Sequence, residues 1–140
     1  MIVLDTNVVS ELMRPSPNPA IESWIANRPA TSLFFSAVGE AELRFGLAIM
    51  PAGRRRDAFA SEIEAMLRED FADRILPFDS EAARAYAVIA ASRRVAGRPI
   101  AEADCQIAAI ARSRGMALAT RNVRDFEDTG IHILDPWTSI

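Results

Sequence analysis

Four acidic residues, Asp5, Glu42, Asp104 and Asp125, stand where a carboxylate is either unusual or well placed for chemistry. The first follows three apolar residues, Ile2 to Leu4, that are typical of a short buried strand. An amphipathic pattern begins directly after it, so we expect Asp5 at the carboxyl end of a strand, where open parallel sheets bind their ligands. Capping of the following helix is the alternative interpretation of this aspartate.

Glu42 lies in the segment SAVGEAELRFGLAIM, which has helical periodicity. On that helix Val38, Glu42, Phe45 and Ile49 fall on one stripe, with spacings of four, three and four. A carboxylate on an apolar stripe is costly unless it is hydrogen-bonded, paired or bound to a metal. Glu42 therefore either reaches an arginine or the edge of the core, or belongs to a site.

Asp104 lies in the segment IAEADCQIAAIARSRG, near the start of a predicted helix. Ile107, Ala108 and Ala111 follow at three, four and seven residues, which places Asp104 on the face that packs against a sheet. The unpaired N–H groups of a helix start favour negative charge, so capping alone is a sufficient alternative explanation.

The segment LATRNVRDFED places a second group of polar residues after a predicted strand. Its topology repeats that of IVLDTN, so both segments deliver side chains to the same rim of the sheet. The residues delivered there are Thr120, Arg121, Asn122 and Asp125. Solvation of a loop is the alternative for Asp125, and it is the preferred interpretation for Glu127 and Asp128.

Converging carboxylates with no histidine among them suit Mg²⁺ or Mn²⁺, which are hard cations that keep several waters. Without a cation the carboxylates would repel one another and raise their pKa values. A divalent ion there lowers the pKa of a bound water and orients a phosphodiester. The residues therefore point to metal-assisted hydrolysis of a nucleic-acid backbone.

Composition excludes several other chemistries. The 140 residues fit one domain, residues 1–140, and the apolar runs are shorter than a membrane span. Asp5, Asn7 and Glu11 interrupt what would have to be a secretory signal, so a cytoplasmic protein is expected. One cysteine and one histidine allow neither an internal disulfide nor a Cys/His zinc site.

The net charge is −3 and every basic residue is arginine. The arginine clusters, including Arg93-Arg94-Arg98, are interpreted as solvated helix faces.

The order of the predicted elements indicates an α/β fold with a parallel sheet covered by helices on both faces. The strands are predicted at residues 2–4, 32–35, 75–78, 117–120 and 131–134. The helices are predicted at residues 7–13, 19–27, 37–50, 53–70, 80–96 and 101–114. Asp79 is expected to cap the fifth helix, and Gly97 with Pro99 to end it.

In these motifs, MIVLDTNVVSELM, SAVGEAELRFGL and GRPIAEADCQIAAIARSRGMALATRNVRDF, the chain resembles the PIN-domain nucleases, most closely VapC-type toxins and their FitB-like branch. The resemblance implies a three-layer α/β/α sandwich with strand order 3-2-1-4-5. It implies a Mg²⁺-dependent endoribonuclease, with Mn²⁺ as a substitute, acting on structured RNA such as tRNA or rRNA. It also implies a VapB-type antitoxin, dimerisation, and contact with operator DNA through the antitoxin.

The same resemblance assigns the metal-binding acids to Asp5, Glu42 and Asp104, with Thr6 and Asn7 supporting the first. Asp125 is favoured for the fourth position over Asn122, with Thr120 nearby, and Arg121 is expected to contact the RNA backbone. Several apolar residues could line an antitoxin groove, but core packing is the preferred interpretation of each. These are Leu12, Met13, Ile21, Trp24 and Ile25.

Other families that gather acids at strand ends fit less well. A haloacid-dehalogenase-type phosphatase needs a second aspartate where this chain has Asn7, and a response-regulator receiver needs a lysine. A dinucleotide-binding domain needs glycines after the first strand. The remaining alternative is a FitB-like component of a DNA-binding repressor complex with weak or no nuclease activity.

Overall fold

Five short parallel strands form the centre of the molecule, in the order β3-β2-β1-β4-β5. The computed structural model describes residues 1–138. The strands are β1 (Ile2–Leu4), β2 (Leu33–Ser36), β3 (Ile75–Leu76), β4 (Ala117–Ala119) and β5 (Ile133–Leu134). Leu4 pairs with Ala119 across β1 and β4, so the next residue of each strand, Asp5 and Thr120, lies at the same edge of the sheet. The predicted strand order is confirmed.

All six predicted helices are present, with small differences in their ends. They are α1 (Thr6–Leu12), α2 (Pro19–Ala26), α3 (Ala37–Ala48), α4 (Arg54–Ala65), α5 (Ser80–Val95) and α6 (Glu102–Ser113). The single helix predicted at residues 53–70 is wrong in its last turn, because α4 passes into a π-helical turn, η2 (Met66–Asp70). Two 3₁₀ turns, η1 (Ala30–Ser32) and η3 (Val123–Phe126), were not predicted.

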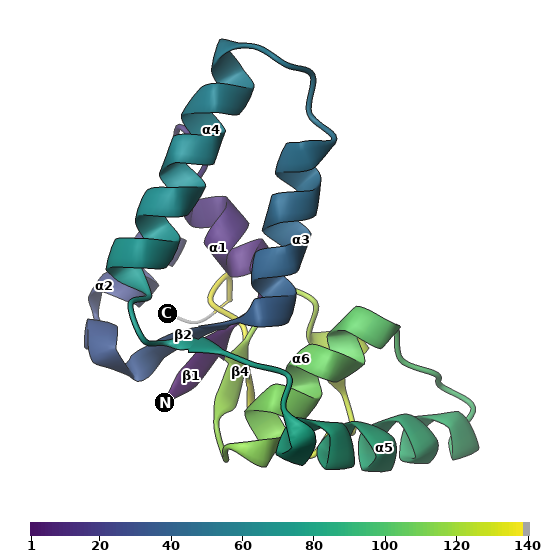
Figure 1. Cartoon of the computed structure of the whole chain (residues 1–140). Coiled ribbons are helices and arrows are strands. Elements are labelled where there is room, and N and C mark those ends of the chain that lie inside the picture. The colour runs from purple at the N-terminus through teal and green to yellow at the C-terminus, as the bar shows by residue number, and fades with distance from the viewer. Residues whose placement is uncertain (139–140) are drawn as a thin grey trace.

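The helices cover both faces of the sheet, as predicted for a three-layer α/β/α sandwich (Figure 1). Alternation along the strands sends Val3 and Leu118 to one face, where they pack with residues of α5 and α6. Leu4 and Phe35 face the other side, among residues of α1, α2 and α4. Because both faces are buried, the strands are almost continuously apolar.

The ends of α5 confirm the signals in the sequence. The Oδ1 atom of Asp79 accepts a hydrogen bond from the N–H of Ala82 at 3.0 Å, as a helix N-cap does. Gly97 follows the last turn with φ +73°, a conformation that glycine adopts without strain.

The apolar stripe predicted for α3 is correct only at Val38, which is half-buried against the core, and is wrong for the later positions. Phe45 and Ile49 are 66% and 68% exposed, and Glu42 is exposed with them, whereas Gly39 and Leu43 are buried. Gly39 lies directly against the Phe35 ring, and a Cβ at this position would be 2.4 Å from Cε1 of that ring. The close approach at Gly39 decides which face of α3 packs inward, and it turns Glu42 outward.

α3 and α4 extend beyond the sheet as a pair (Figure 1). Arg44 on α3 donates to Glu40 on the same helix at 2.7 Å and to Glu64 on α4 at 2.5 Å. These two carboxylates raise the pKa of Arg44 above its ordinary value, and Glu64 has the larger effect. Among residues 1–138, none of the helices combines the length and apolarity needed to cross a membrane.

Candidate active site

Asp5 lies at the carboxyl end of β1 and is only 5% exposed. Its Oδ1 accepts a hydrogen bond from the N–H of Thr6 at 2.8 Å. Its Oδ2 accepts one from the hydroxyl of Thr120 at 2.7 Å and one from the amide of Asn7 at 3.1 Å. Asp5 therefore caps α1 and also joins a network between two strand ends, so both interpretations of this residue describe part of its geometry.

Thr120 determines which groups donate and which accept in this hydrogen-bond network. Its hydroxyl oxygen accepts hydrogen bonds from the Asn7 amide at 3.2 Å and from the N–H of Asn122 at 3.0 Å. Both acceptor positions are used, so its one proton goes to Asp5. Asn7 in turn accepts from the N–H of Arg121 at 3.2 Å. Thr120 and Asn7 thus hold the Asp5 carboxylate as an acceptor and tie the ends of β1 and β4 together.

Glu42 reaches the same edge from α3. Its Oε1 accepts a hydrogen bond from the Thr6 hydroxyl at 2.7 Å. Thr6 therefore contacts two acids, Asp5 through its backbone N–H and Glu42 through its side chain. Burial raises the pKa of Asp5, and the charge of Glu42 raises it further, whereas the hydrogen bonds that Asp5 accepts lower it.

Asp104 is partly buried in the first turn of α6, and the stripe predicted behind it is confirmed by buried Ile107, Ala108 and Ala111. Ala101 is the N-cap of α6 and no side chain caps that end by a hydrogen bond, although Asp104 does lie in the first turn, where the helix start favours negative charge. Burial raises the pKa of Asp104 to about 6, and the charges of Asp5, Asp125 and Glu42 contribute to the shift in that order. Asp104 is therefore within electrostatic range of the other three predicted acids.

The polar residues that follow β4 form two groups, one at the acidic edge of the sheet and one on the outer surface. Asp125 lies in η3 with an exposed side chain, and its charge raises the pKa of Asp104. Asn122 is exposed, and its backbone N–H, rather than its side chain, joins the network through Thr120. Glu127 and Asp128 pair with Arg98 on the surface, as expected of solvated loop residues.

Arg121 is exposed beside this edge, and its guanidinium lies over the ring of Trp137 with 5.2 Å between them. Stacking on an aromatic face restricts the long side chain while leaving its N–H groups available to a ligand.

The donor set fits a hard divalent cation, because it consists of carboxylate, amide and hydroxyl oxygens. Within residues 1–138, no three His, Cys, Asp or Glu side chains lie close enough together to hold an ion as they stand. The four acids form an electrostatic cluster whose repulsion a cation would relieve, not a preformed chelate.

A groove of about 1070 Å³ opens on the face of the sheet that carries α1 and α2. It is lined mainly by apolar side chains, and three of the residues predicted for such a groove, Leu12, Met13 and Ile25, line it. Ile21 and Trp24 do not line the groove; they are buried in the core at 0% and 6% exposure, which confirms core packing, the preferred interpretation, for both.

One residue near the acids was missed. Arg93 was interpreted as part of a solvated face, yet it is 6% exposed and contacts the backbone of η3. A signal was present in the sequence, because Arg93 stands four residues after Ile89 and eleven after Ala82, both fully buried.

Fold and site together define an α/β/α protein with an acidic site at the carboxyl edge of a parallel sheet. The chain belongs to the PIN-domain family, whose model matches residues 2–131. The resemblance seen in the sequence is thereby confirmed.

One relative and two solved structures illustrate the similarity. The chain is 46% identical over 137 residues to the VapC ribonuclease Y4jK of Sinorhizobium fredii, a match that covers 98% of each chain. The crystal structure of FitAcB from Neisseria gonorrhoeae matches with a TM-score of 0.93 and 37% identity, over 99% of this chain and 100% of that one. The structure of FitAB bound to an IR36 DNA fragment matches with a TM-score of 0.93 and 36% identity, over 100% and 98% of the two chains.

Proposed function

We propose that this protein is a metal-dependent endoribonuclease and the toxin of a toxin–antitoxin pair. The observation that carries the proposal is the pKa of Asp104, which burial, followed by the charges of three other carboxylates, Asp5, Asp125 and Glu42, raises to about 6. Burial and repulsion of this kind are typical of functional sites. The name of the Sinorhizobium fredii relative, a VapC ribonuclease, supports RNA as the substrate.

Asp5 and Asp104 would hold Mg²⁺, or Mn²⁺ in its place. When bound, the ion lowers the pKa of a water and offsets the negative charge that develops on the phosphate. Asp5 is suited to this role because three hydrogen bonds fix its two oxygens. Glu42 and Asp125 are exposed, so their carboxylates are accessible to the attacking water and would orient it or a second ion. Arg121 would contact the RNA backbone through its guanidinium N–H groups.

The groove supports a peptide partner. Its apolar lining, which includes Leu12, Met13 and Ile25, suits the apolar side chains of an antitoxin segment. The similarity to FitAB bound to an IR36 DNA fragment supports operator binding through that antitoxin. A toxin dimer would bring two antitoxin segments to the operator.

A second candidate function is a FitB-like component of a DNA-binding repressor complex with weak or no nuclease activity. The similarity to the DNA-bound FitAB complex favours it. The retention of all four acids favours the nuclease.

Cleavage of total RNA by the purified protein in Mg²⁺ separates the two functions. We expect Asp5→Asn and Asp104→Asn each to reduce cleavage at least a hundredfold, because losing transition-state stabilisation of about 3 kcal/mol has that effect. The matched control is Asp57→Asn, which removes an exposed carboxylate on α4 and should leave cleavage unchanged. Equal activity in the wild type and both site variants would overturn the nuclease assignment.

A further inference from the structure

Arg93 is a buried cation at the end of α5. Only 6% of the residue is exposed, although arginine is one of the residues least often buried without a partner. Within residues 1–138 it forms no ion pair, and the neighbouring acids Glu127 and Asp128 pair with Arg98 instead. The charge of Arg93 must therefore be stabilised by other groups.

Three backbone carbonyls supply that stabilisation. The Nε–H of Arg93 donates to the carbonyl of Arg98 at 2.6 Å. One terminal nitrogen donates to the carbonyls of Asp125 and Glu127, at 3.1 and 2.9 Å. Hydrogen bonds from a charged donor are stronger than those between neutral groups, and the planar guanidinium fixes their directions. Arg93 thus ties the end of α5 to the loop that contains η3.

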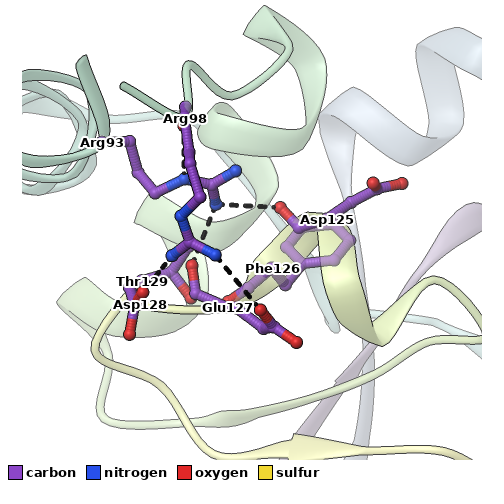
Figure 2. A network of polar contacts seen from close by, with 7 residues as sticks. All are labelled: Arg93, Arg98, Asp125, Phe126, Glu127, Asp128 and Thr129. Carbon is purple, nitrogen blue, oxygen red and sulfur yellow. Dashed lines mark hydrogen bonds and ion pairs between the residues drawn. The ribbon is translucent and has the colours of Figure 1, made fainter. Parts of the chain in front are cut away.

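The hydrogen bonds to Asp125 and Glu127 hold the backbone on both sides of Phe126. The Phe126 ring is fully buried, and its carbonyl accepts a hydrogen bond from the Thr129 hydroxyl at 2.6 Å. The Asp125 carboxylate points away from Arg93 and Arg98 (Figure 2). Arg93 therefore does not neutralise Asp125; it holds the main chain from which this carboxylate extends, and the charge of the carboxylate acts on Asp104.

We propose that Arg93 is a positioning residue that sets the Asp125 carboxylate within the acidic site, an inference that rests on the proposed function. Asp125 lies on a short 3₁₀ turn with an exposed side chain, so its own helix provides little restraint. The buried guanidinium of Arg93 restrains this turn through its hydrogen bonds to the backbone carbonyls of Asp125 and Glu127. Lysine cannot replace it fully, because an ammonium lacks the fixed planar geometry.

The test is a double-mutant cycle between Arg93 and Asp125, read by the affinity of the purified protein for Mn²⁺. We expect Arg93→Gln to weaken Mn²⁺ binding fivefold or more, and Arg93→Lys to weaken it less. In an Asp125→Ala background, neither substitution should weaken binding further. The matched control is Arg98→Gln, which removes the exposed ion pairs to the same loop and should change binding less than twofold.

Hydrogen exchange gives a second readout. Amide exchange at residues 123–127 should accelerate in Arg93→Gln while the strands stay protected, whereas it should stay unchanged in Arg98→Gln. If Arg93→Gln fails to fold, Arg93→Lys is used in the cycle instead. We expect this variant to lose Mn²⁺ affinity twofold, and we expect no such loss in the Asp125→Ala background. Wild-type Mn²⁺ affinity in a folded Arg93 variant, or an equal loss in both backgrounds, would overturn the proposal.

The outcomes also separate this inference from the proposed function. A wild type that binds Mn²⁺ but cleaves no RNA would contradict the nuclease assignment. The coupling between Arg93 and Asp125 would still be decided by the Mn²⁺ affinities.

Discussion

At the scale of single residues, polar side chains at the sheet edge serve structure and site together. Asp5 caps α1 with one oxygen and meets Thr120 and Asn7 with the other. Thr6 connects Asp5 to Glu42, which a sequence pattern does not reveal. Asp104 differs from them, because its carboxylate accepts no cap hydrogen bond in α6 and faces three other acids. Its environment thus favours the protonated form when no cation is present.

Asp104 is therefore expected to make the metal-free protein less stable as the pH rises. Its folded pKa of about 6 exceeds the ordinary 3.8, so the folded state retains the proton between these values and stability is lost as the pH rises through about 6. Asp104→Asn removes this loss. After allowance for solvent screening, we expect the variant to be more stable at pH 7 by about 1 kcal/mol. Urea unfolding of chelator-treated protein between pH 4 and 7 measures it.

The control for this measurement is Glu102→Gln in the same first turn of α6. Glu102 is exposed, and its negative charge interacts favourably with the N-terminus of α6. Removing this charge should therefore slightly lower the free energy of unfolding. Lower stability of Asp104→Asn at pH 7 would contradict the repulsion argument and favour a structural role for Asp104.

At the scale of elements, α3 shows how one small residue orients a helix. Gly39 allows α3 to pack directly on the Phe35 ring, which is itself fully buried and packs against Phe71 with 5.6 Å between ring centroids. This contact places Leu43 inward and leaves Glu42 exposed, within reach of Thr6. The orientation of Glu42 thus depends on a glycine one turn earlier.

Two alanine substitutions on α3 should have opposite effects. Gly39→Ala places a methyl group against the Phe35 ring and should destabilise by about 1–3 kcal/mol through overpacking. Gly46→Ala meets nothing within 4 Å and should stabilise by about 0.5–1 kcal/mol, because alanine favours the helix. Equilibrium unfolding in urea measures both. A neutral Gly39→Ala would show that the sheet and Phe35 adjust freely at this contact.

At the scale of the whole molecule, the sheet topology brings distant segments to one edge. The chain leaves β1 toward β2 and β3 and returns on the other side to β4 and β5, so the neighbouring connections diverge between β1 and β4. This is where open α/β sheets bind ligands. The acids come from β1, α3, α6 and the loop after β4, so the site forms only when the fold is complete.

Because the site exists only in the folded chain, a bound cation should stabilise the whole molecule. At a concentration of Mn²⁺ about one hundred times its Kd, the stabilisation is about 2.7 kcal/mol, which corresponds to a rise of several degrees in Tm. Differential scanning calorimetry with and without Mn²⁺ measures the rise. It should shrink sharply in Asp5→Asn and persist in Asp57→Asn. An equal rise in Asp5→Asn would mean that the ion binds elsewhere.

The sequence alone determined the element order, the parallel sheet, its strand order through the family resemblance, and the strand-end positions of Asp5 and Thr120. These features follow from local periodicity and from the rule that parallel strands present their carboxyl ends at one edge. Asp104 was also identified by its local pattern, since the residues behind it on α6 are apolar and buried.

The tertiary structure decided what local patterns leave open. It turned Glu42, Phe45 and Ile49 of the predicted α3 stripe outward, because Gly39 packs closely on Phe35. It buried Arg93, whose partner Asp125 is 32 residues away in the chain, and it directed the Asp125 carboxylate away from that arginine (Figure 2). These outcomes depend on contacts between segments far apart in sequence, whereas periodicity reports only which residues share a face.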